Sequence, residues 1–292
     1  MTSEEKRHEG AYEFVRAVHD GRPYAAGKLG TSEYNALQWY ITHRKGTSTP
    51  KQYPRIILTH MVVNAGLFPA RPDILDSWCE HMICDVLPSM DYMVEWLHET
   101  RFLNTYAPTS KRGVLRSLEP YYESDPANRY TRSIPKNANI AIISPFADSI
   151  ALQIPKLPTL WSTCPIWPID AQFIPIKTYF SPLVASETTS WPTDVDDWMA
   201  ARDHIVKQVQ ESGANYVFIG CGALSLPIAV ALKRIGCIVF HTGGATQIMF
   251  GIKGGRWDTH SVISGFYNEF WIRPAVHEIP TRSDAIERGC YF

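Results

Sequence analysis

The sequence predicts an α/β protein with a single Rossmann-like, doubly wound and mostly parallel sheet that carries a helical insert. Two observations predict this class. Short apolar runs of strand length alternate with helical patterns along the chain, and several runs end in Gly or Ser-Pro turns. The chain of 292 residues is 45% hydrophobic, which is sufficient for one large core. We therefore expect one α/β unit over 1–292, with the insert at roughly 56–135.

The N-terminal third predicts a helix, a strand and a second helix. Apolar residues share one helical face over about 3–20, and Gly21 and Pro23 then break the pattern. A short strand is expected over 24–29. Gly30, Thr31, Ser32 and Glu33 follow as the turn and first residues of the next helix.

The central part predicts mainly helices. Apolar residues recur at helical intervals over 74–87 and again over 90–97. A strand over 140–144 closes in Ser144 and Pro145. The segment 155–192 is rich in Pro and Trp, which indicates ordered but irregular connections around one strand near 174–179.

The C-terminal third contains the most informative pattern, two strands that each end in a glycine turn. A helical stripe before Gly213 precedes the first strand over 217–219, and a helix over 227–234 leads to the second strand over 237–241. The crossover between them predicts parallel pairing. Both turns should therefore lie at one sheet edge, where backbone N–H groups bind anions; the predicted contacts are Gly220, Gly222, Ala223, Gly243 and Gly244.

The first glycine turn is an imperfect dinucleotide fingerprint. Ser225 stands where a third glycine is expected, and the second strand ends in His241 and Thr242 without an acid to accept ribose hydroxyls. These departures argue against NAD and FAD. A turn needed only for close packing of helix on sheet is an equally good interpretation of the first loop alone.

Charge and cysteine usage exclude several partners. With 28 Lys and Arg against 29 Asp and Glu, the net charge of -1 predicts no nucleic-acid or anionic-membrane footprint. Six cysteines without CxxC spacing and a polar, charged N-terminus predict a cytoplasmic location without a signal peptide. The uncharged stretch 216–232 contains glycines and a proline, so we expect no membrane span.

Several short motifs together resemble a known family. They are LGTSE at 29–33, SPF at 144–146, GCGA at 220–223, FGIKGGRW at 250–257, NEFWIRP at 268–274 and GCYF at 289–292. In this order they resemble GT-D-fold glycosyltransferase-like proteins found with surface polysaccharide genes. The resemblance extends from Tyr24 onward. It implies a Rossmann-like sheet, a nucleoside diphosphate sugar as donor and a glycan as acceptor.

The resemblance also implies roles for the first glycine turn. GT-D enzymes carry an Asp-x-Glu motif that serves the nucleotide sugar and its divalent metal; here Glu33 matches the Glu, but Thr31 stands in place of the Asp. A single carboxylate is a poor Mg²⁺ or Mn²⁺ site unless donor phosphates add oxygens. The alternative is a metal-free site in which Glu33 accepts sugar hydroxyls while Gly30, Thr31 and Ser32 hold phosphate or ribose. Helix-dipole stabilisation alone would also select an acid there.

Other candidates lie near the C-terminus. Lys253 and Arg256 flank two glycines, a spacing that suits a diphosphate clamp, although a solvated basic turn has the same pattern. Arg273 is a weaker candidate because an Arg beside Trp is often structural. Glu269 and His241 are candidate general bases. Glu269 would instead pair with Arg273 if the segment were helical, and a lone strand-end His is commonly a core group.

Three functions follow from these residues. The leading one is a glycosyltransferase that moves a monosaccharide from a nucleoside diphosphate sugar to a glycan hydroxyl. The second is a methyltransferase that uses S-adenosylmethionine, which the missing ribose-binding acid disfavours. The third is an inactive nucleotide-sugar-binding relative, motivated by Thr31. Ser-His-Asp and zinc-ligand spacings are absent from the sequence.

Overall fold

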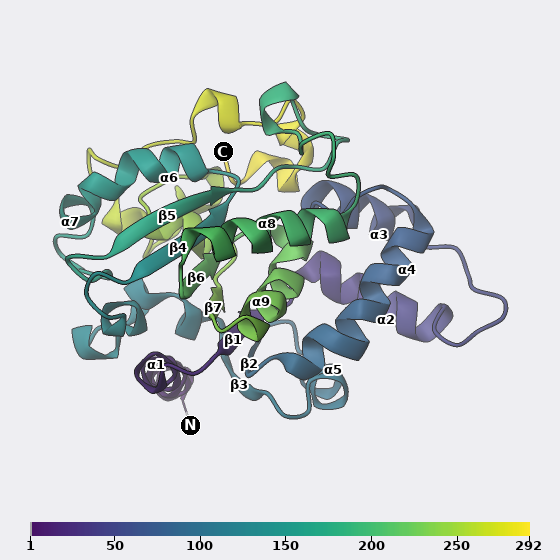
Figure 1. Cartoon of the computed structure of the whole chain (residues 1–292), viewed down its shortest axis with the longest axis horizontal. Coiled ribbons are helices and arrows are strands. Elements are labelled where there is room, and N and C mark those ends of the chain that lie inside the picture. Colours follow the sequence, from purple (N-terminus) through teal and green to yellow (C-terminus); the bar gives the residue numbers. More distant parts are fainter. Residues whose placement is uncertain (1) are drawn as a thin grey trace.

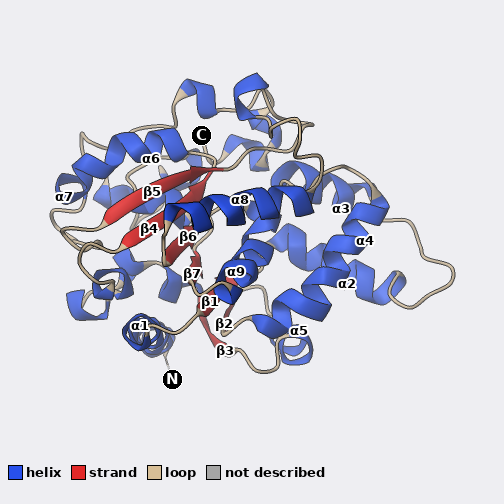
Figure 2. Ribbon diagram, in the orientation of Figure 1, coloured by secondary structure: helices blue, strands red, loops and turns tan. Residues whose placement is uncertain are grey.

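The computed structural model describes residues 2–292 and contains one open sheet of seven parallel strands (Figures 1 and 2). The spatial order is β3-β2-β1-β7-β6-β4-β5. The strands are β1 (Tyr24–Lys28), β2 (Tyr92–Glu95), β3 (Lys111–Val114), β4 (Asn139–Ser144), β5 (Gln172–Lys177), β6 (Tyr216–Ile219) and β7 (Ile238–His241). The predicted fold class is confirmed.

Helices cover both faces of the sheet, as a parallel sheet requires. One face carries α2 (Thr31–His43), α3 (Arg55–Thr59), α4 (Pro72–His81), α5 (Thr100–Tyr106), α8 (Trp198–Ser212) and α9 (Ser225–Arg234). The other carries α1 (Ser3–Asp20), α6 (Ala147–Gln153), α7 (Leu157–Leu160) and α10 (Ala245–Met249), with the C-terminal segment. Side chains of β6 alternate between the two cores: Val217 and Ile219 face the first, and Phe218 faces the second.

Local signals placed most element boundaries correctly. Helix α1 begins with a capping box between Thr2 and Glu5 and ends at Gly21, which is left-handed with φ 63°. Helix α8 ends in the same way at Gly213. The predicted parallel pairing of β6 with β7 is confirmed, with Val217 opposite Val239.

The segment 90–97 is a correction to the sequence prediction. Instead of a helix, Tyr92–Glu95 forms β2, and Lys111–Val114 adds β3 as the edge strand, so the 56–135 region contains strands as well as helices. Met93 packs into one core while Tyr92 and Val94 pack into the other, which is the period of a strand. Four residues are too few to separate this period from a helical one.

The connections reverse direction between β4 and β6, which are neighbours in the sheet. The chain leaves β4 into α6 on one face and leaves β6 into α9 on the other. In open α/β sheets, ligands bind at the carboxyl ends of strands beside such a reversal. Within residues 2–292, no helix combines the length and the apolar character needed to cross a bilayer.

Candidate functional site

A cavity of about 450 Å³ lies at the carboxyl edge of the sheet. Its volume is in the range of small-ligand sites. Loops that follow β1, β4, β6 and β7 line it, and they bring together many of the residues selected from the sequence. These are Gly30, Thr31, Ser32, Glu33, Ser144, Gly220, Gly222, His241, Gly243, Gly244 and Arg256. Segments far apart in the chain therefore converge on one site.

The glycines of this cavity are required for close approach of backbones as well as for turn conformation. A Cβ at position 220 would lie 2.5 Å from the carbonyl oxygen of Gly243, so the two glycine loops touch. Gly222 has φ +60°, and a Cβ there would collide with the carbonyl of Ala65. Close packing thus explains both glycines of the first loop, but against the second glycine loop and Ala65, and the same loop lines the cavity.

Two backbone N–H groups remain available in these loops. Those of Gly222 and Gly244 have no hydrogen-bond acceptor within residues 2–292, whereas the N–H of Gly243 donates to the Ile219 carbonyl at 3.0 Å. Both free groups belong to partly exposed residues of the cavity wall. Such N–H groups bind anions.

Lys28, which the sequence analysis did not select, places an ammonium group in the cavity. Among the described residues it has no hydrogen-bond or ion-pair partner, and its Nζ lies 4.8 Å from the centre of the Trp96 ring. Burial lowers the pKa of Lys28, while the charges of Glu119 and Glu33 act in the opposite direction. A sheltered cation without a direct ion-pair partner is suited to an anionic ligand. Its position at the carboxyl end of a buried strand was the only sequence signal.

Glu33 lies in the cavity at the first turn of α2, with its carboxylate folded back over Gly30. Burial raises the pKa of Glu33; its own backbone N–H and the charge of Lys28 lower that pKa by less. The carboxylate therefore stabilises the helix N-terminus, as the dipole interpretation expects, and also faces the ligand space. Because this helix end holds an internal anion, phosphate is better placed beside Lys28 than beside Thr31.

His241 closes β7 and is a hydrogen-bonding group rather than a base. Its Nδ1 lies 3.1 Å from the Ile219 carbonyl oxygen, which assigns the proton to Nδ1 and leaves Nε2 as an acceptor. Burial, together with the charge of Lys28, lowers the pKa of His241 to about 3, although the hydrogen bond to Ile219 acts in the opposite direction. A neutral imidazole of such low basicity does not deprotonate an acceptor hydroxyl at neutral pH.

Arg256 is the second cation of the cavity. Its guanidinium pairs with Glu287, donates to the Tyr291 hydroxyl at 3.3 Å and stacks on the Tyr291 ring at 4.7 Å. Glu287, Tyr291 and Ile286 belong to the C-terminal segment and also line the cavity. The sequence motif at 289–292 contains Tyr291, but no sequence pattern indicated that Ile286, Glu287 or Tyr291 lines the site.

Two buried polar atoms in the cavity wall have no partner within the described part of the chain. They are Thr178 Oγ1 and Gln247 Oε1, on residues 2% and 3% exposed. Orphaned buried polar atoms are costly, and both atoms are inaccessible to solvent. Cys221 also lines the cavity, but burial raises the pKa of its thiol to about 12, so it is not a nucleophile.

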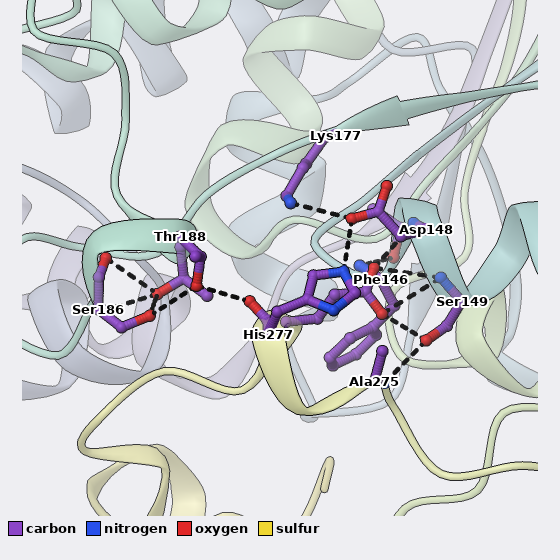
Figure 3. Close-up of polar contacts among 11 residues, drawn as sticks. Phe146, Asp148, Ser149, Lys177, Ser186, Thr188, Ala275 and His277 are labelled. Carbon is purple, nitrogen blue, oxygen red and sulfur yellow. Dashed lines mark hydrogen bonds and ion pairs between the residues drawn. The ribbon is translucent and has the colours of Figure 1, made fainter.

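Ser144 acts through local structure, because its hydroxyl accepts a hydrogen bond from the Phe146 N–H at 3.1 Å. The helix that follows, α6, has its first N–H groups satisfied by Glu278: Asp148 N donates to Glu278 Oε1 at 2.8 Å. Figure 3 shows Asp148 between Lys177 and His277, at 3.1 and 2.9 Å. This N-terminus is therefore closed to a phosphate.

Four candidates lie outside the set of described residues that line the cavity: Ala223, Lys253, Glu269 and Arg273. Ala223 is buried and its N–H donates to Ala65, while Lys253 Nζ lies 5.1 Å from the Tyr267 ring centre. Arg273 pairs with Asp258 at 2.6 Å instead of with Glu269, which is exposed on a non-helical turn. The structure does not bring these four to the candidate site.

Tryptophans of the proline-rich segment pack rather than stack on ligand. Trp161 and Trp167 are buried, and both indole N–H groups donate to the Met249 carbonyl, at 2.9 and 3.1 Å. Trp191 is stacked against Phe68.

The donor set does not fit a divalent metal. Mg²⁺ and Mn²⁺ require several oxygen ligands, and within residues 2–292 no group of three or more His, Cys, Asp and Glu side chains is placed to hold an ion. Glu33 shares its surroundings with the Lys28 ammonium, which repels a cation.

Comparisons with known proteins add no assignment: no protein-family model, no curated protein and no solved structure matches the chain.

Proposed function

We propose that the chain is a glycosyltransferase that moves a monosaccharide from a nucleoside diphosphate sugar to a glycan hydroxyl. The observation that carries this proposal is the placement of two cations, Lys28 and Arg256, around one cavity built by the glycine loops. The electrostatic influence of Arg256 on Lys28 indicates that both act on the same space. That pattern suits the diphosphate of the donor.

Three of the proposed diphosphate-binding groups, Lys28 and the backbone N–H groups of Gly222 and Gly244, have no other partner within residues 2–292, whereas Arg256 also pairs with Glu287. Lys28 offers a point charge, Arg256 a planar fork, and Gly222 and Gly244 offer free backbone N–H groups. As the sugar leaves, negative charge develops on the diphosphate oxygen, and these donors stabilise it.

Glu33 is the proposed base. Its raised pKa makes it a better proton acceptor than an exposed carboxylate. The acceptor hydroxyl transfers its proton to Glu33 as its oxygen bonds to the anomeric carbon. The bond from that carbon to the diphosphate oxygen breaks, and the nucleoside diphosphate leaves with the electron pair. Single displacement inverts the anomeric configuration.

The test is a thermal-shift panel of nucleoside diphosphates and their sugars. A ligand at about 100 times its Kd stabilises the folded state by about 2.7 kcal/mol, an easily measured shift. Failure of every nucleotide to stabilise the protein would count against the proposal. S-adenosylmethionine belongs in the panel, since stabilisation by it alone would favour the methyltransferase alternative.

A donor hydrolysis assay separates an enzyme from an inactive relative. Glu33→Gln keeps the size of the side chain and removes its basicity, so we expect donor binding to remain and turnover to fall about 10²–10⁴-fold. Binding without hydrolysis or transfer by the unmodified protein would favour the inactive alternative.

All six cysteines are free thiols, the state that reducing conditions maintain, and we retain the cytoplasm as the proposed location.

A further inference from the structure

The C-terminal residues 290–292 are held beside the cavity by backbone hydrogen bonds, and Tyr291 forms part of the cavity wall. Gly255 N and Arg256 N donate to the carbonyls of Phe292 and Cys290 at 3.1 and 2.9 Å, and Gln247 Nε2 donates to that of Tyr291 at 2.8 Å. A Cβ at Gly254 would lie 2.9 Å from the Tyr291 carbonyl oxygen, so close packing explains this glycine. The end of the chain is therefore anchored.

The turn just before this wall is held less firmly. Glu287, Arg288 and Gly289 have φ values of 46°, 60° and 73°, and the first two are rare conformations for residues with a Cβ. The Glu287 N–H donates to Asn64 Oδ1 at 3.2 Å, and the Glu287 carboxylate pairs with Arg256. The turn is thus strained, and its other hydrogen bonds are local: Gly289 N donates to Ile286, Phe292 N to Gly289, and Cys290 Sγ to the Glu287 carboxylate at 3.7 Å.

The Arg256–Glu287 pair is accessible to solvent and exchangeable. The two side chains are 41% and 34% exposed, and within residues 2–292 Arg256 pairs with no other carboxylate. Exposed ion pairs are weak because water competes with both partners. Two oxygens of a phosphate group accept two parallel hydrogen bonds from a guanidinium, and a diphosphate carries more negative charge than a carboxylate.

We propose that Glu287 is a built-in competitor for the anionic ligand: its carboxylate occupies Arg256 in the empty site and must leave when a diphosphate binds. Retaining Glu287 beside the diphosphate would place several negative charges together, in a cavity that already contains Glu33. The Glu287 side chain turns away to release Arg256, and residues 290–292 keep their backbone hydrogen bonds to Gly255 and Arg256. The identity of the anion as a diphosphate rests on the proposed function.

Isothermal titration with inorganic pyrophosphate and with a panel of nucleoside diphosphates tests the exchange. Glu287→Gln removes the competing charge. We therefore expect pyrophosphate, and any nucleoside diphosphate that binds the unmodified protein, to bind the variant about three- to tenfold more tightly. Asp284→Asn is the matched control, because it changes the net charge equally from an exposed position of the same segment; we expect less than about twofold change. Thermal unfolding verifies that each variant is folded.

A double-mutant cycle assigns the effect to the pair. With Arg256→Gln, binding weakens, and adding Glu287→Gln should no longer tighten it. Unchanged or weaker binding by Glu287→Gln overturns the inference, even where nucleotides bind the unmodified protein and the proposed donor stands. Tighter pyrophosphate binding without any nucleotide binding supports the exchange and removes the proposed donor. No binding of either ligand overturns both.

Discussion

Replacement of Lys28 by Met separates a functional cation from a structural one. The ammonium has no hydrogen-bond or ion-pair partner in residues 2–292 and lies against Trp96. Burial lowers the pKa of Lys28 below its unfolded value, so the folded state is penalised for holding the protonated form at neutral pH. Met retains the apolar stem without the charge. We therefore expect Lys28→Met to leave the free energy of unfolding unchanged or raise it, while ligand binding weakens.

The size of the binding loss follows from the position of the charge. Two unit charges about 4 Å apart interact by about 4 kcal/mol at an effective dielectric constant of about 20. Desolvation and competition from water reduce this to about 1.5–3 kcal/mol for a hydrogen bond to a charged group. We expect Lys28→Met to weaken binding of a nucleoside diphosphate by about 10- to 150-fold.

Calorimetry and thermal unfolding measure the two effects, and Lys253→Met is the matched control. Lys253 carries the same charge beside Gly254 but contacts the Tyr267 ring outside the cavity. Its replacement should change affinity by less than about threefold. Unchanged affinity in Lys28→Met, together with a loss in Lys253→Met, would refute the placement of the diphosphate.

Three further results are expected. Because the pKa of His241 is lowered to about 3, the imidazole is neutral in the folded state and protonated in the unfolded state between about pH 3 and 6.5. The free energy of unfolding should therefore fall as the pH is lowered through this range, by up to about 1.4 kcal/mol per pH unit. The fall should be smaller in His241→Gln. In denaturant melts, Gly222→Ala should cost about 2–4 kcal/mol, because its Cβ meets Ala65, against about 1 kcal/mol for Gly213→Ala, where the space is open. EDTA should not change nucleotide affinity in titrations of metal-free and Mn²⁺-supplemented protein, since Glu33 has no partner ligands; a large loss with EDTA would contradict the metal-free site.

Local sequence patterns determined most of the elements, though not the short strands β2 and β3, and also the edge at which the site lies. Buried runs such as Tyr216–Ile219, the left-handed glycines at 21 and 213, and the crossover from β6 to β7 all depend on neighbours in the chain. Because carboxyl ends of parallel strands share one edge, the convergence of the glycine turns with Gly30 and Ser144 was predictable.

Only the tertiary structure decided which side chains face the cavity. Lys253 and Lys28 are both lysines beside glycine turns, yet long-range packing directs one onto Tyr267 and the other into the cavity beside Trp96. The partner of Arg256 comes from the last residues of the chain. The direction of a side chain and the desolvation of its charge depend on atoms distant in sequence, and local periodicity contains no information about them.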